Sequence, residues 1–463
     1  MNVVKWTIGL AVVAIGSSAC GQTAVQSAFD YDYRLVNSED AATEPAIEGE
    51  ADEESTDDAC CETCEPGCCD ACGDVGCGDC CGYSDGGCGL FGPCCLGEPW
   101  TLKDWLTPCC DGPNYGGWIS MGYYDNHERL SFNDGDSLSF NDLPNKLNLD
   151  QAWLYVEKVA ESDGCNTDFG YRFDAMYGVH GHAAQSYGNP RSFEPVFGKN
   201  QGSWDASLDH GPYAFAMPQA YGEVARGDVK MKVGHFFTPV GYEVIPDTGN
   251  FFYSHTLTHY NSEPFTHTGA LAQFEATDTM TLYAGWVLGW DTGFDQFLSG
   301  NAYVGGFTYK PSDDISFTYM NTIGNLGWRS GGEFGFTQHI VGLFTLTENM
   351  TWVAQSDYLH TDGIITDPTF ANEEGGLTNY LIYKLNDCWS VGGRLEWWKT
   401  NALVGEPASF YDITGGLNYH ATANLVIRPE IRYDWTPSDV AFDNVFGEDY
   451  NQTWFGIDAI VTY

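Results

Sequence analysis

Apolar and polar residues alternate with a period of two in many segments between Gly117 and Tyr463. One clear segment sets Trp389, Val391, Gly393, Leu395 and Trp397 against Ser390, Gly392, Arg394 and Glu396. Successive side chains of a β-strand point to opposite faces, whereas a helix repeats every three or four residues. The pattern therefore predicts strands with one apolar and one polar face.

Sixteen such segments are predicted, and the lengths of their connections alternate. They lie near 117–124, 147–159, 168–177, 214–224, 229–237, 267–276, 280–290, 302–309, 315–323, 339–347, 350–358, 376–385, 389–398, 410–420, 425–434 and 453–463. Short connections such as 277–279 follow the even strands, and long ones such as 178–213 follow the odd strands. Short periplasmic turns, long external loops and an even strand number are typical of outer-membrane barrels.

Aromatic residues bracket the apolar faces and distinguish a membrane barrel from a soluble sandwich. Pairs eight residues apart recur, and eight residues rising about 3.3 Å each at a tilt of about 40° cover roughly 20 Å. This height is close to the apolar band of an outer-membrane barrel. The predicted aromatic girdle is Trp389, Trp397, Tyr411, Tyr419, Tyr433, Phe455 and Tyr463. The terminal aromatic residue resembles the signal that barrel-assembly machinery recognises.

The expected fold is all-β: a transmembrane antiparallel up-and-down β-barrel of about 16 strands, with a disordered acidic and cysteine-rich N-terminal extension. Residues 1–20 have a short basic start, an apolar run and small residues, as a secretory signal peptide does. Residues 21–59 are an acidic disordered linker, because they bury too little apolar surface to fold. Residues 60–113 form a cysteine-rich segment, and 114–463 form the barrel.

The cysteine-rich segment holds fourteen cysteines between Cys60 and Cys110. Their even number in an exported chain favours disulfides, within the chain or to envelope partners. Cys-x2-Cys pairs such as Cys61 and Cys64 resemble zinc ligands, so a zinc site is the alternative. A partly reduced, unstructured segment is the third possibility. Lipidation of Cys20 is disfavoured, because Ser17 stands where a lipoprotein box has Leu. Cys388 lies alone in a periplasmic turn, where it can pair with this segment or remain free.

Charge excludes one class of partner. The chain has 19 basic and 64 acidic residues, a net charge of −45. Nucleic acid needs a basic surface, so we expect no nucleic-acid partner. The part from Gly117 onward nets −27, from 16 basic and 43 acidic residues, which favours cations in a pore.

The polar faces of the predicted strands provide the pore-lining residues. Arg428 and Arg432 share one face, and turning it to lipid costs roughly 2 to 4 kcal/mol per arginine at the midplane. The expected pore-lining residues are Arg172, Asp174, Arg394, Glu396, Asp412, Arg428, Glu430, Arg432, Asp434 and Asp458. These charges either pair among themselves and stiffen the barrel, or form a transverse field that orients polar solutes.

The third long loop, 238–266, is the candidate constriction of the pore. Its polar and aromatic candidates are Tyr242, Glu243, Asp247, Tyr253, His255 and Glu263. The alternative is an external loop that packs on its neighbours. The loop 125–146 is acidic but lacks the spacing of a calcium loop, so a solvated acidic loop is favoured over a Ca²⁺ site.

The sequence resembles the OmpL-like β-barrel porin family. Gly234–Glu243, Asn250–Ser254 and Pro264–Gly269 look like that family's central block, and Arg428–Asp434 looks like its penultimate strand. The resemblance runs from about Gly117 to Tyr463 and implies passive pore formation. It implies no catalytic residue and does not extend to the acidic linker or the cysteine-rich segment.

The expected function is an outer-membrane porin, a water-filled channel for small polar solutes or ions with a preference for cations. Its expected partners are outer-membrane lipid, such solutes and the barrel-assembly machinery, with a homo-oligomer and envelope partners of Cys60 to Cys110 as further candidates. The alternatives are a structural envelope protein cross-linked through its cysteine-rich arm, or a barrel enzyme such as a phospholipase. No enzyme motif is present, so we expect no catalytic residue, no cofactor and no dedicated metal site.

Overall fold

A computed structural model describes most of the predicted barrel. It covers residues 96–107, 112–125, 143–161, 164, 166–188, 204–362, 373–401, 407–437 and 451–463. The predicted signal peptide, acidic linker and fourteen clustered cysteines lie outside these residues, as does most of the loop 125–146.

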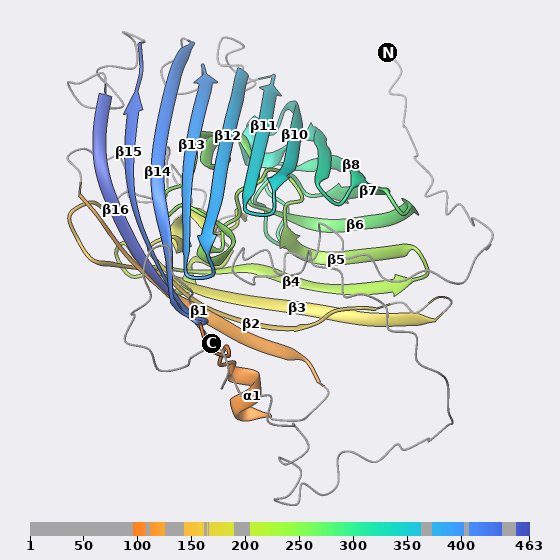
Figure 1. Ribbon diagram of the computed structural model, residues 1–463. Coiled ribbons are helices and arrows are strands. Elements are labelled where there is room, and N and C mark those ends of the chain that lie inside the picture. The colour runs from red at the N-terminus through yellow and green to blue at the C-terminus, as the bar shows by residue number, and fades with distance from the viewer. Residues whose placement is uncertain are drawn as a thin grey trace, which may run out of the picture.

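Sixteen antiparallel strands form one closed barrel (Figure 1). Each strand pairs with its neighbours in the chain, and β1 closes on β16 with Trp118 opposite Thr462. The strands are β1 Asn114–Tyr124, β2 Asn148–Lys158, β3 Thr167–Gly178, β4 Ala214–Arg226, β5 Val229–Phe237, β6 Thr266–Thr277, β7 Met280–Val287, β8 Asn301–Ser312, β9 Ile315–Asn325, β10 Phe334–Thr347, β11 Met350–Thr361, β12 Glu373–Asn386, β13 Trp389–Thr400, β14 Ala408–Thr422, β15 Leu425–Trp435 and β16 Asn451–Thr462. Closure leaves no unpaired strand edge, which a membrane requires.

The predicted fold class is confirmed, with differences at strand ends. β10 begins at Phe334 rather than near residue 339, because its first residues pair with the end of β9, Phe334 opposite Asn325. β7 ends at Val287 rather than near residue 290. The short helices were not predicted: α1 Leu102–Leu106, α2 Gly181–Ala184, α3 Leu257–Ser262, η3 Ala206–Leu208, η4 Asp247–Gly249 and η5 Gly327–Ser330. Among the described residues, no helix is long and apolar enough to span a bilayer.

The two faces of the wall differ as the alternation predicts on β3 and on β12 to β16. On β15 the side chain of Ile431 is 57% exposed on the outside, whereas Arg432 is fully buried inside. The predicted girdle residues lie on the outer face. Trp389 stacks on Tyr419 with ring centroids 4.3 Å apart, and Tyr411 stacks on Trp435 at 5.2 Å.

The inner face of β6 to β9 is mixed, because a cluster of apolar side chains lies among polar ones such as Gln273 and Thr322. Leu271, Tyr283, Val304 and Met320 are buried there in one cluster. The inner face is therefore not uniformly polar on this side of the barrel. These side chains pack against one another and against the loop between β5 and β6, so they are not solvated.

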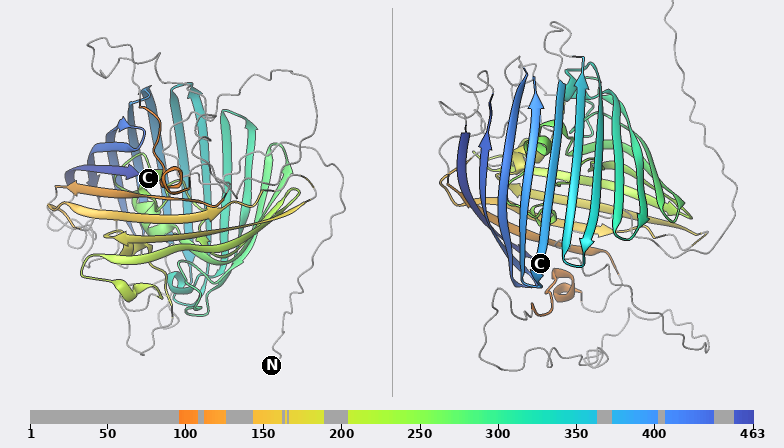
Figure 2. Two further views of the ribbon diagram at one scale, coloured as in Figure 1. Left: turned by 90° about the horizontal axis from the view of Figure 1, so that it is seen from below. Right: turned by 45° about the horizontal axis from the view of Figure 1, so that its top comes forward.

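The segment before β1 lies beneath the end of the barrel where the C-terminus is (Figure 2). The backbone N–H of Ala423 donates to the carbonyl of Leu96 at 3.1 Å, and Asn424 exchanges two hydrogen bonds of 2.7 Å with the backbone of Trp100. Residues 96–107 thus dock on the β14–β15 turn. Cys388, in the β12–β13 turn, is disulfide-bonded.

Candidate functional site: a loop bound inside the barrel

The loop between β5 and β6, residues 238–265, lies inside the barrel, where the green segment is visible in Figure 2. Its apolar side chains enter separate clusters around the wall. Val240 packs with Leu271 and its neighbours, Ile245 packs with Trp118 and Trp153, and Phe252 packs with Val353 and Tyr380. Burial of apolar side chains on several sides fixes the position of the loop across the lumen.

Arginines of the wall donate to backbone carbonyls of this loop. Arg394 on β13 donates to the carbonyl of Ser254 at 2.6 Å, and Arg432 on β15 donates to that of His255 at 2.6 Å. Arg428, also on β15, donates to the carbonyls of Asp247 and Asn250 at 2.9 and 2.5 Å. The planar guanidinium has several donors in a fixed geometry, so it can bind the wall and the loop at once.

The same arginines pair with carboxylates. Arg394 lies 2.9 Å from Asp412 and 3.2 Å from the loop residue Glu243. Arg432 lies 2.8 Å from Asp412 and 2.7 Å from Asp434.

Arg428 pairs with Asp458 on β16 at 2.5 Å. Charged hydrogen bonds of this kind are stronger than neutral ones, and they hold each guanidinium at a defined height in the lumen.

Two carboxylates of the wall also bind the loop, by accepting hydrogen bonds from its backbone N–H groups. Glu430 accepts the backbone N–H groups of Tyr253 at 2.8 Å and Ser254 at 3.2 Å. Glu396 accepts those of Leu257 and Thr258, both at 2.8 Å, at the start of α3. The first N–H groups of a helix have no partner within the helix, so a carboxylate there satisfies them.

The charged residues on the inner faces of β13 to β16, called the charge ladder from here on, have a role besides mutual pairing or a transverse field. The charges mainly hold the loop, in addition to pairing among themselves. Seven carboxylates and three arginines meet here, and all are buried: Glu243, Asp247, Glu396, Asp412, Glu430, Asp434 and Asp458 with Arg394, Arg428 and Arg432. Removing one member of a buried pair leaves an uncompensated charge, which costs about 3 to 5 kcal/mol.

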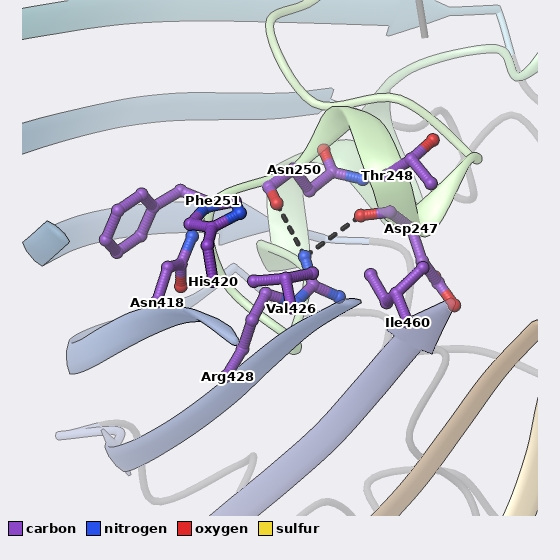
Figure 3. Close-up of a pocket in the computed structure, with 9 residues that line it drawn as sticks. All are labelled: Asp247, Thr248, Asn250, Phe251, Asn418, His420, Val426, Arg428 and Ile460. Atoms are coloured by element: carbon purple, nitrogen blue, oxygen red, sulfur yellow. Dashed lines mark hydrogen bonds between the residues drawn. The ribbon is translucent and has the colours of Figure 1, made fainter. Parts of the chain in front are cut away.

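A small cavity remains between the loop and the wall where β14, β15 and β16 meet η4 (Figure 3). It has a volume of about 20 Å³ and is lined by Asp247, Asn250, His420 and Arg428, among others. A space of this size holds about one water molecule. The loop therefore fits the wall closely at this level.

Two predicted pore-lining residues, Arg172 and Asp174, lie elsewhere. They occupy the inner face of β3, where Arg172 pairs with Asp174 at 2.7 Å and with Glu157 of β2 at 2.5 Å. The other predicted pore-lining residues are on β13 to β16 and lie along one side of the β5–β6 loop. The predicted loop residues Tyr242, Asp247 and Tyr253 are in the loop and inside the barrel, but their phenol and carboxylate groups are packed against the wall.

Several residues that hold the loop were not singled out from the sequence. The side chain of Gln151 on β2 donates to the carbonyl of Ile245 at 2.7 Å, and Gln355 on β11 accepts the N–H of Tyr242 at 2.9 Å. Trp398 donates to Ser262, whose hydroxyl in turn donates to Glu374 at 2.6 Å. Their one signal in the sequence is a polar residue at an inward position of a predicted strand.

The sequence of the barrel matches one protein family, β-barrel porin-2, OmpL-like, over residues 113–463. The chain belongs to this family. No curated protein matches it significantly. As a member of this porin family, with the barrel fold, it is a porin of the bacterial outer membrane.

Solved porins share the architecture at low sequence identity. OmpF of Salmonella typhi, in complex with daunomycin, is 11% identical with a TM-score of 0.51, over 76% of this chain and 97% of that one. The outer-membrane channel DcaP of Acinetobacter baumannii is 11% identical with a TM-score of 0.46, again over 76% of this chain and 97% of that one. The anion-selective porin of Comamonas acidovorans is 9% identical with a TM-score of 0.47, over 76% and 99%.

Proposed function

We propose that this porin passes small cations and small polar solutes through a lumen that the β5–β6 loop narrows to a constriction. The observation that carries the proposal is the attachment of one loop to β13 and β15 through Arg394, Arg432, Glu396 and Glu430. A loop held from several strands keeps one position in the lumen, so it restricts the size of the solutes that pass.

The exposure of inward-facing residues supports this location. Near the short periplasmic turns, the inner residues Lys310, Ser316 and Lys384 are partly exposed. At the level of the loop, the ladder residues are buried. We infer that the lumen is wider toward the periplasm and narrowest at the loop.

The preference for cations rests on the charge at the loop. Carboxylates outnumber arginines seven to three at that level, which favours cations. Lys310 and Lys384 act against this excess, but they lie at the wider end. Electrostatic effects are largest where water is scarce, so the narrow level dominates selectivity.

The test is planar-bilayer conductance of the full chain under a KCl gradient. We expect discrete conductance steps and a reversal potential with the sign of a cation-selective channel. An anion-selective reversal potential would overturn the charge argument. Absence of conductance from correctly folded, heat-modifiable barrel would overturn the proposal of an open pore.

A second function is favoured by the contacts beneath the barrel. Residues 96–107 dock on the β14–β15 turn, and Cys388 of the neighbouring turn is disulfide-bonded. The docked segment supports an arm that is held on the periplasmic side and cross-links the porin to envelope components through Cys60 to Cys110, and the disulfide of Cys388 indicates that thiols on this side are oxidised. Envelope fractionation without reductant, with the Cys388→Ser variant as comparison, tests it: a porin that elutes only as the free chain would refute cross-linking.

A further inference from the structure

The β5–β6 loop meets β10 and β11 through a cluster that the ladder does not include. Glu263, near the end of the loop, faces His339 of β10 and Asp357 of β11. One potential ligand atom from each residue lies within 4.8 Å of the other two. The three residues are 3%, 1% and 5% exposed.

The two carboxylates of this cluster have no arginine or lysine partner among the described residues. Glu263 is hydrogen-bonded by Gln355 and lies 3.0 Å from His259, and Asp357 is bonded by Gln355 at 2.8 Å and by His339 at 2.7 Å. Two buried negative charges at this distance repel each other and have lost their hydration. Glutamine supplies hydrogen bonds without supplying a compensating charge.

The imidazole of His339 adds a second observation. Its Nδ1 lies 2.7 Å from the Oδ1 of Asp357, and its buried Nε2 has no hydrogen-bond partner in the part of the chain that the structure describes. The contact of 2.7 Å suits ligation of one ion by Nδ1 and by Asp357 together, since neighbouring ligands of an octahedral ion at about 2.1 Å lie about 3 Å apart.

We propose that Glu263, His339 and Asp357 bind a divalent transition-metal ion such as Mn²⁺ or Zn²⁺. Two carboxylates and one imidazole are ligands that such ions accept, and a charge of +2 compensates both carboxylates. The ion joins the loop to β10 and β11, which only β12 separates from the arginine-bearing β13 in the wall. The expectation of no metal site came from the absence of a linear motif, and these three ligands are spread over the loop and two strands.

The site goes beyond the proposed function, because its test does not depend on conductance. The probe is Mn²⁺ added to purified, metal-stripped full-length protein, followed by electron paramagnetic resonance. Mn²⁺ is chosen because it prefers oxygen and nitrogen ligands, so the cysteine-rich segment competes weakly. We expect one bound equivalent per chain and a higher unfolding temperature, which EDTA reverses.

Variants locate the ion. Glu263→Gln and His339→Gln should each lose the bound equivalent and the chelator response. Asp205→Asn is the matched control, a buried carboxylate of the loop before β4 that accepts the N–H groups of Met217 and Ser186, and it should bind as the parent does. Should His339→Gln not fold, Glu263→Gln, which changes only the loop, carries the test.

Two outcomes would overturn the site. One is a parent protein that binds no Mn²⁺ or Zn²⁺ and unfolds at the same temperature with and without EDTA, in which case protons compensate the pair. The other is equal Mn²⁺ binding by the parent and Glu263→Gln. Conductance can persist in either case, so the porin proposal stands or fails separately.

Discussion

Replacing Arg394 by methionine should release the β5–β6 loop from the wall of β13. The substitution removes the hydrogen bond to the carbonyl of Ser254 and the ion pairs with Glu243 and Asp412. Asp412 keeps Arg432 at 2.8 Å, whereas Glu243 loses its only guanidinium partner among the described residues and keeps His255 and Tyr380. Methionine preserves much of the volume, so the main loss is electrostatic.

The size of the effect follows from the burial of these charges. Arg394 and its two carboxylate partners are almost fully buried, and breaking such a pair costs about 3 to 5 kcal/mol. At about 1.4 kcal/mol per factor of ten, the bound position of the loop becomes less favourable by roughly 10² to 10⁴-fold. We expect a larger single-channel conductance, frequent transitions between levels and a stronger preference for cations.

The assay is single-channel recording in a planar bilayer, with a gel shift on heating to confirm that the barrel has folded. Arg172→Met is the matched control, since Arg172 is a buried inner-face arginine that pairs with Glu157 and Asp174 of the wall. It removes the same charge from the lumen. Equal changes in conductance for both variants would refute loop release and leave only a charge effect.

Three further predictions concern the wall, the arm and pH. A fluorophore attached through Ile431→Cys should be quenched by lipid-soluble agents, because this position is exposed on the outer face. One attached through Lys310→Cys should be quenched by aqueous agents, because this position lies on the inner face. The reverse result would refute the strand register. Cys388→Ser should leave conductance unchanged and free one thiol, which peptide mapping by mass spectrometry without reduction should place among Cys60 to Cys110; a freed thiol outside that segment would refute a link to the arm. Burial raises the pKa of Asp205 to about 6, so the folded state holds this proton more tightly than the unfolded chain, and the resulting stability is lost as pH rises through about 6. Thermal unfolding between about pH 4 and pH 7 should show this loss in the parent, and a loss of the same size in Asp205→Asn would contradict it.

The sequence by itself determined the strands and their faces. Arg428 and Arg432 alternate with Ile431 and Tyr433, and only one orientation keeps guanidinium groups out of lipid. The aromatic ends, the alternating loop lengths and the block around Gly234–Glu243 then indicated a porin. Each of these signals is local, because the lipid boundary acts on every strand separately.

Only the tertiary structure decided what occupies the lumen. The hydrogen bond from Arg394 to Ser254 joins residues 140 positions apart, and the cluster of Glu263, His339 and Asp357 joins one loop and two strands. An inward polar residue is equally compatible with water, an ion pair or the backbone of a loop, so the alternation cannot distinguish these environments. The inner face of β6 to β9 gives the opposite example, in which apolar residues face inward. Val304 and Met320 can do so only because other side chains exclude water from them. Which segments pack there depends on how the whole barrel closes.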